Sequence, residues 1–156
     1  HVNDTKRIIR AIEVYRMTDR TISYHQQISR CEPPIYNFII FGIRMDRQRL
    51  YERINRRVDE MIEKGLVKEV ESLVKMGYDK CSVAIQGLGY KEILWYLKGE
   101  ATLDEVVNLL KRDTRRYAKR QMTWFNKIKE VIWLDVDEGY SKALKKMVEY
   151  IERYRK

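Results

Sequence analysis

Apolar residues recur at every third or fourth position along most of the chain, a spacing that places them on one face of an α-helix. Capping residues and glycines mark where such helices begin and end: Asn3 or Asp4 can cap the first, Asp46 can cap the second, and Gly65 and Gly77 can follow helix ends. We expect helices over residues 5–17, 47–64, 66–76, 90–98, 103–126 and 140–154.

Two short segments are apolar, rich in β-branched and aromatic residues and too short for helices: residues 37–43 (NFIIFGI) and 131–134 (VIWL). We expect both to be buried β-strands. The polar segment 18–34, which ends in Pro33-Pro34, is expected to complete the first helix and form a linker. Because two strands alone do not make a stable sheet, we expect them to join a larger parallel sheet. We therefore expect the chain, which begins with His, to be the C-terminal part of a longer protein.

The helix expected over residues 103–126 has an apolar side and a basic side. Thr102 followed by Glu105 forms a capping-box pattern at its start. The apolar stripe consists of Val107, Leu110, Thr114, Ala118, Met122 and Phe125. Six of the ten residues from Lys111 to Arg120 are basic. The residues expected on the opposite side are Arg112, Arg115, Arg116, Lys119 and Arg120.

This basic run leads directly into amide, hydroxyl and aromatic residues at positions 121–125. Cations can pair with phosphates, and the side chains that follow can read or stack a base, so the combination indicates RNA binding. The alternative is a solvated helix face without a ligand.

The whole chain is basic, with 32 Lys and Arg against 23 Asp and Glu and a formal net charge of +9, which indicates a polyanionic partner. Its 156 residues suffice for one domain-sized core. The longest apolar run, residues 93–97, is far shorter than the roughly 18 residues of a membrane span, so no membrane partner is expected. Cys31 and Cys81 lack metal-ligand spacing and are expected to be reduced thiols of a cytoplasmic protein. No metal site is expected in this chain.

Four motifs, in order along nearly the whole chain, resemble the tRNA dimethylallyltransferase (tRNA isopentenyltransferase) family. They are HVNDTKRIIRAIEVY (1–15), RINRRVDEMIEKGLVKEV (53–70), QGLGYKE (86–92) and RRYAKRQMTWF (115–125). The resemblance implies transfer of a dimethylallyl group from dimethylallyl diphosphate to N6 of the adenosine 3′ of the tRNA anticodon, with Mg²⁺ required. One departure is Asp19, where the family usually has Gly; Asp tolerates the left-handed conformation that such a turn needs.

The fold class implied by the resemblance is α/β, a P-loop kinase-like parallel-sheet core with a helical insertion domain. Residues 1–34 would be the end of the insertion domain and a linker. Residues 35–156 would be the C-terminal half of the core, predominantly helical, with the tRNA-binding helices. The phosphate-binding pattern G-x-x-x-x-G-K-[ST] is absent from the chain, so Mg²⁺ would be bound mainly by the missing part. The chain alone is expected to be inactive, and the intact protein to be a monomer.

The resemblance also assigns residue roles. It places Arg57 at the donor's pyrophosphate, where a guanidinium group stabilises the charge that develops on the leaving group; the alternative is a surface arginine paired with Glu60. The candidate contacts to the tRNA anticodon stem-loop are Lys6, Arg7, Arg10, Gln86, Gly89, Tyr90, Lys91, Arg116, Lys119, Arg120, Gln121, Thr123 and Trp124. For the arginines and lysines the alternative is a solvated face, for the glycine turn an ordinary helix start, and for Trp124 core packing.

Two other functions remain open at this point. An adenylate isopentenyltransferase of the same superfamily would act on free nucleotides, and it would not need the basic helix. A non-enzymatic helical RNA- or DNA-binding module is also consistent with the net charge of +9. A P-loop in the sequence upstream of His1 would favour the enzyme over the module.

Overall fold

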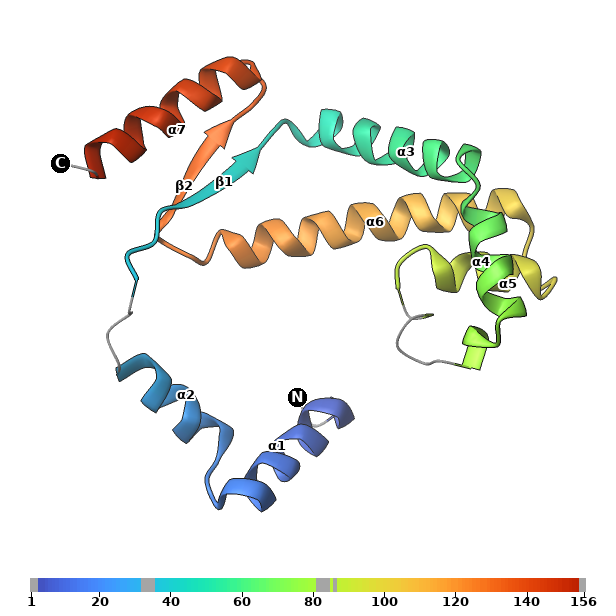
Figure 1. The fold of residues 1–156 in the computed structure, drawn as a ribbon, viewed down its shortest axis with the longest axis horizontal. Coiled ribbons are helices and arrows are strands. Elements are labelled where there is room, and N and C mark those ends of the chain that lie inside the picture. Colours follow the sequence, from blue (N-terminus) through green and yellow to red (C-terminus); the bar gives the residue numbers. More distant parts are fainter. Residues whose placement is uncertain (1–2, 32–35, 81–84, 86, 155–156) are drawn as a thin grey trace. The chain divides into compact units, whose positions relative to one another are not determined.

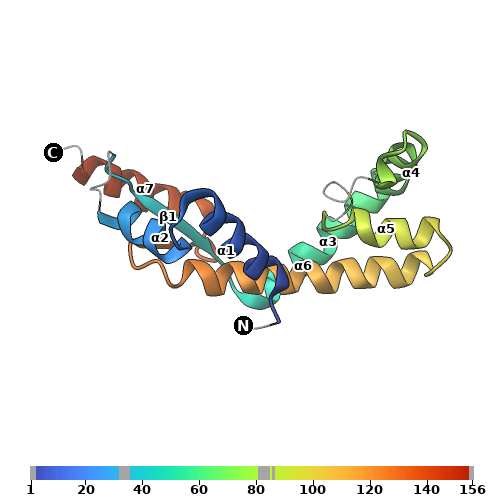
Figure 2. The ribbon, with the colours of Figure 1, turned by 90° about the horizontal axis from the view of Figure 1, so that it is seen from below.

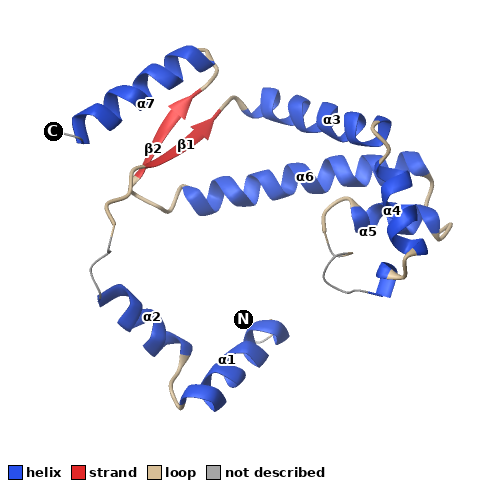
Figure 3. Cartoon of the chain, in the orientation of Figure 1, coloured by secondary structure: helices blue, strands red, loops and turns tan. Residues whose placement is uncertain are grey.

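The computed structural model describes residues 3–31, 36–80, 85 and 87–154. The chain divides into two compact units, residues 1–38 and residues 39–156 (Figure 1). The described part of the first unit contains two helices and no strand, and the second unit contains a small parallel sheet and the remaining described helices (Figure 3).

The first unit is formed by α1 (Thr5–Thr18) and α2 (Ile22–Cys31). Asp4 caps α1 by accepting a hydrogen bond from the backbone N–H of Arg7. The helix ends at Asp19, whose φ of 51° is left-handed, so this aspartate adopts the conformation expected at a position where glycine is usual.

The structure corrects one expectation for this unit. The segment expected to be a linker forms α2, because Thr21 accepts a hydrogen bond from the N–H of Tyr24 at its start and no Gly or Pro interrupts residues 22–31. In addition, the apolar side of α1 is exposed in this unit, including Ile8 and Ile12.

The second unit contains β1 (Ile40–Arg44) and β2 (Val131–Asp135), which pair in parallel with Ile40 opposite Val131 and Arg44 opposite Asp135. Both predicted strands are confirmed, and they pair with each other in parallel. Gly42 is required by this pairing, because an added Cβ would lie 2.7 Å from the Trp133 ring.

The first strand is less buried than expected. Ile43 in β1 is 59% exposed, whereas Val131 and Leu134 in β2 are buried. The difference arises because α7 packs against β2, where Leu134 lies in a core cluster with Val136 and Ala143.

The described part of the connection from β1 to β2 is mostly helical. Its helices are α3 (Arg47–Glu63), α4 (Leu66–Lys75), a 3₁₀ turn (Tyr78–Lys80), α5 (Tyr90–Leu97) and α6 (Leu103–Phe125). After β2 the chain ends with α7 (Tyr140–Tyr154). The predicted caps are confirmed: the Asp46 carboxylate accepts from two N–H groups of the first turn of α3, and Thr102 and Glu105 form a capping box on α6.

The core of this unit lies in two places. α3 and α6 run alongside each other, with α4 and α5 at the end where α6 begins (Figures 1 and 2). One core cluster fills that end and consists of Val58, Leu66, Val70, Ile93, Val106 and Leu110. The other joins the sheet to α7 and consists of Leu134, Val136 and Ala143 with Phe41, Met45 and Met147. Val106, which the predicted stripe of α6 omitted, is fully buried.

Candidate nucleic-acid interface

The six basic residues of α6 divide into three pairs with different surroundings. The first pair attaches α6 to α3. Lys111 Nζ lies 2.5 Å from a carboxylate oxygen of Asp59, and Arg115 donates to the side-chain oxygen of Asn55 at 2.6 Å. The Arg115 guanidinium also lies 6.0 Å from the centre of the Tyr51 ring. Arg115 was expected on the exposed side of α6, and this expectation is wrong, because the residue is half-buried against α3.

The second pair, Arg112 and Arg116, converges on Asp113. Arg112 Nε and Nη2 lie 2.9 and 3.4 Å from the two carboxylate oxygens, and Arg116 Nη1 lies 3.4 Å from one of them. The pKa of Asp113 is lowered mainly by its hydrogen bond to Arg112, with further contributions from the charges of Arg112, Arg116 and Lys91. Lys91 at the start of α5 therefore belongs to the same positively charged cluster. Its Nζ lies 4.7 Å from the centre of the Trp95 ring.

The third pair, Lys119 and Arg120, is exposed in the last turns of α6. No ion pair to either residue is found in the described part of the chain. The Arg120 guanidinium lies 5.8 Å from the centre of the Tyr117 ring, and Gln121 Nε2 lies 3.5 Å from the Tyr117 hydroxyl. These cations are therefore free to pair with phosphates.

The remaining candidates of α6 are also exposed. Trp124 is 61% exposed and makes an edge-to-face contact with Phe125, with 4.8 Å between ring centroids. The alternative that Trp124 packs in the core is therefore wrong. Thr123 donates its hydroxyl hydrogen to the backbone oxygen of Lys119 at 3.0 Å.

The glycine turn before α5 is held by internal contacts. Gly89 has a φ of 105°, and its N–H donates to the carboxylate of Glu92 at 2.8 Å. Glu92 is only 4% exposed. The Tyr90 hydroxyl donates to Glu69, and this bond is the main reason that the pKa of Tyr90 is raised. RNA contacts by Gly89 and Tyr90 stay predictions beside these structural roles, and Gln86 lies outside the described residues.

The candidates in the first unit lie on the exposed surface of α1. Lys6 is exposed, Arg7 forms an ion pair with Asp4 at 3.0 Å, and Arg10 forms one with Glu13 at 3.4 Å. Ion pairs at this exposure contribute little to stability, so they do not prevent these cations from binding phosphate.

Arg57 is exposed on α3. It lies two positions from Asn55 and from Asp59, both of which contact α6, so it points to a different side of α3. The alternative pairing with Glu60 is not found among the described residues. Instead, the Glu60 carboxylate lies 4.0 Å from Lys64 Nζ.

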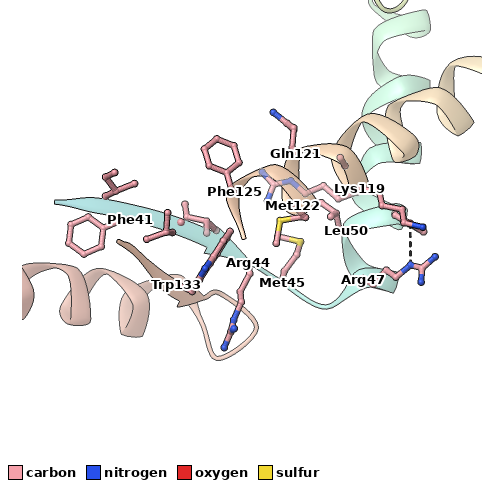
Figure 4. Close-up of a pocket in the computed structure, with 17 residues that line it drawn as sticks. Phe41, Arg44, Met45, Arg47, Leu50, Lys119, Gln121, Met122, Phe125 and Trp133 are labelled. Carbon is pink, nitrogen blue, oxygen red and sulfur yellow. Dashed lines mark hydrogen bonds between the residues drawn. The ribbon is translucent and has the colours of Figure 1, made fainter. Parts of the chain in front are cut away.

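A groove of about 570 Å³ lies between the sheet, the start of α3 and the end of α6 (Figure 4). Sequence reasoning did not detect it, because its walls come from segments far apart in the chain. Its lining is mainly apolar, and its basic and amide side chains are Arg44, Arg47, Arg53, Lys119 and Gln121. Lys119 and Gln121 were predicted from the motif in α6. Arg44 and Arg47 lie outside the four motifs, and Arg53 begins the motif 53–70 but was assigned no role. Arg57 is not among the residues that line the groove.

Neither a metal-binding cluster nor a membrane-spanning helix is found in the described part of the chain. Among residues 3–31, 36–80, 85 and 87–154, no three His, Cys, Asp or Glu side chains gather where they could bind a metal ion. Over the same residues, no helix combines the length and apolar character that a membrane crossing requires.

Nearly the whole chain is similar in sequence to known proteins. Residues 1–128 match the sequence model of the family described as IPP transferase. The tRNA dimethylallyltransferase of Acetivibrio thermocellus is 62% identical over 156 residues, and that of Carboxydothermus hydrogenoformans is 51% identical over 151 residues. The alignments cover 99% and 97% of this chain and 50% and 47% of those proteins. The chain therefore spans about half the length of the curated relatives it matches.

Two solved structures resemble the chain. The full-length tRNA isopentenylpyrophosphate transferase from Bacillus halodurans has a TM-score of 0.73 and 39% identity, over 97% of this chain and 46% of that one. The tRNA delta(2)-isopentenylpyrophosphate transferase from Staphylococcus epidermidis has a TM-score of 0.73 and 36% identity, over 98% of this chain and 50% of that one. The fold of this chain is thus similar to about half of each of these two structures.

Proposed function

The chain belongs to the IPP transferase family, and we propose on that basis that it forms the tRNA-binding part of an enzyme that prenylates tRNA. The whole enzyme would transfer a dimethylallyl group from dimethylallyl diphosphate to N6 of the adenosine 3′ of the anticodon. Its curated relatives carry the name tRNA dimethylallyltransferase, which supports this assignment.

The observation that carries the RNA-binding part of this proposal is the exposed side of α6. Arg112 and Arg116 are exposed near Lys91, and Lys119 and Arg120 follow without ion pairs in the described part of the chain. Exposed Trp124 then supplies an aromatic surface. Phosphates of the RNA backbone would pair with these arginine and lysine side chains, and an unstacked base could stack on Trp124.

The proposed reaction explains why many phosphate contacts are needed. N6 of an adenine inside a stack cannot be reached, so the base must leave the stack at a cost of a few kcal/mol. Contacts along the anticodon stem-loop offset this cost. An enzyme that acts on a free nucleotide would not need them.

At the donor, the new bond joins N6 of the adenine to the allylic carbon, the bond from that carbon to the pyrophosphate oxygen breaks, and N6 loses a proton. Negative charge grows on the departing pyrophosphate. Arg57 is proposed to pair with it through the guanidinium group, which is exposed on α3 and has no ion pair in the described residues.

Several finer features are proposed for the whole protein. The first unit, with α1 and α2, would belong to the helical insertion domain, with its boundary near residue 34. The second would be half of a P-loop kinase-like core. Mg²⁺ would assist the leaving diphosphate and be held mainly by residues that this chain lacks. The intact protein would be a cytoplasmic monomer.

Salt titration of RNA binding tests the RNA-binding part. Each phosphate contact contributes roughly 0.7 to 0.9 to the slope of log K against log salt. We expect this chain to bind an anticodon stem-loop with micromolar or weaker affinity and a steep slope, measured by fluorescence anisotropy at several salt concentrations. A flat salt dependence would contradict the proposal.

A further inference from the structure

Asp113 is a carboxylate in the middle of the basic run of α6. A negative charge at this position repels the phosphates that the surrounding cations attract. Its side chain is 30% exposed, whereas those of Arg112 and Arg116 are 48% and 63% exposed. The carboxylate is thus less exposed than the two guanidinium groups, and it contacts both of them.

The two arginines keep donors for a ligand while they contact Asp113. Arg112 uses Nε and Nη2 on the carboxylate, and Arg116 uses only Nη1. The remaining N–H groups of Arg116 include Nε and Nη2, which form the planar fork that binds phosphate oxygens bidentately.

We propose that Asp113 is a positioning residue of the RNA-binding surface, which holds Arg112 and Arg116 in the conformation that binds phosphates of the RNA backbone. This inference adds Arg112 to the candidate contacts, and it rests on the proposed RNA-binding function. Arginine side chains lose much rotamer freedom when they bind. Because the ion pairs restrict them beforehand, less freedom is lost when RNA binds.

The direction in which Asp113→Ala changes RNA affinity distinguishes this positioning role from a purely electrostatic effect. Asp113→Ala raises the formal net charge from +9 to +10, since one negative charge is removed. Electrostatics alone therefore predicts tighter RNA binding. Positioning predicts the opposite, and we expect affinity for an anticodon stem-loop to fall about three- to tenfold at fixed salt. Alanine has the highest helix propensity, so α6 itself should not be weakened.

Glu138 offers a matched control. Its carboxylate lies 2.9 Å from Lys142 Nζ and 3.6 Å from Lys146 Nζ, and it lies outside the residues that match the family. Glu138→Ala therefore removes the same charge from another basic cluster. We expect unchanged or slightly tighter RNA binding for this variant.

A second experiment asks whether Asp113 acts through the two arginines. In a chain that carries both Arg112→Ala and Arg116→Ala, the further change Asp113→Ala should no longer weaken binding. Circular dichroism and thermal unfolding of each variant verify that the chain is folded. Coupling of this kind is the expected sign of residues that act as one unit.

The outcomes separate this inference from the proposed function. Tighter binding by Asp113→Ala, or equal weakening with and without the arginines, would overturn the positioning role alone. If the unmodified chain binds without salt dependence, RNA binding by α6 is itself wrong. If loss of both arginines has no effect, Arg112 and Arg116 are not phosphate contacts, and the positioning role is overturned.

Discussion

At the residue scale, different arginines are proposed to face a charge that changes during the reaction and a charge that stays constant. Charge grows on the departing pyrophosphate, while RNA phosphates keep theirs throughout. Arg57 is proposed to face the first and Arg120 the second. Arg120 is exposed on α6 beside Tyr117, whereas Arg57 is exposed on another helix, α3. Loss of each arginine should therefore produce a different kinetic defect.

In the full-length enzyme, Arg57→Ala should lower the rate at saturating tRNA and leave tRNA affinity nearly intact. Arg120→Ala should raise the KM for tRNA, reduce the salt slope by about one unit and change the saturated rate little. Steady-state kinetics on both variants measure these effects. If Arg57→Ala impairs only tRNA binding, its assignment to the donor is wrong.

Glu92 is the buried acidic residue of the described chain, and its carboxylate accepts the N–H of Gly89. Glu92→Ala leaves that N–H without its partner beside the core cluster that contains Ile93. We expect the variant to lose about 1–3 kcal/mol of unfolding free energy, measured by urea denaturation. Glu92→Gln keeps an acceptor oxygen and should lose less. Equal losses for the two variants would show that this hydrogen bond is not the cause.

At the element scale, α6 depends on the cap at its first turn. The Thr102 side chain accepts the N–H of Glu105, and the Glu105 carboxylate accepts the N–H of Thr102. Thr102→Ala should destabilise the chain by about 1 kcal/mol at neutral pH. Denaturant unfolding measures this loss. Ser72→Ala, in the middle of α4 and exposed, is the matched control and should have little effect.

The same cap gives a pH dependence. Hydrogen bonds from Thr102 lower the pKa of Glu105 below its ordinary value. A carboxyl group with a lowered folded-state pKa contributes stability above its unfolded pKa of about 4.3 and loses it as pH falls through the folded value. The difference between the unmodified chain and Thr102→Ala should therefore shrink below about pH 4. A difference that stays constant down to pH 2 would contradict this account.

Local signals predicted the helices of the second unit closely. The ends of α3, α4 and α6 lie within one or two residues of the expected positions, because each is set by a cap or a glycine nearby in sequence. α2 was missed because its composition is polar and its helical start depends on Thr21 alone. Burial of β1 was overestimated because burial depends on neighbouring elements, which a sequence pattern does not show.

The sequence predicted only part of the candidate site, because contacts between elements are not visible in a sequence pattern. Helical spacing correctly placed Lys119 and Arg120 on the exposed surface, whereas for Trp124 it left core packing open. It could not show that Arg115 contacts Asn55, because that contact joins residues that are 60 positions apart. The groove beside the sheet was also beyond reach, since strand pairing brings its walls together.

At the scale of the whole molecule, the chain contains more of the residues proposed for RNA binding than of those needed to bind the donor's diphosphate. The cations proposed to contact RNA and the exposed Trp124 are present on α5 and α6. The pattern G-x-x-x-x-G-K-[ST], which cradles phosphates, is absent from its sequence. Its relatives are about twice as long. Binding and chemistry should therefore be separable in experiments on this chain.

We expect this chain alone to show no dimethylallyl transfer while it still binds an anticodon stem-loop. The donor's diphosphate needs several positioned cations or N–H groups to bind and leave, and in this chain Arg57 is the residue proposed for that task. Incubation with labelled dimethylallyl diphosphate and tRNA, beside the full-length enzyme of Acetivibrio thermocellus, measures transfer directly. Label in tRNA from this chain at a rate near that of the full-length enzyme would show that a complete diphosphate site exists within these 156 residues. The proposed division between RNA binding here and donor binding elsewhere would then be wrong.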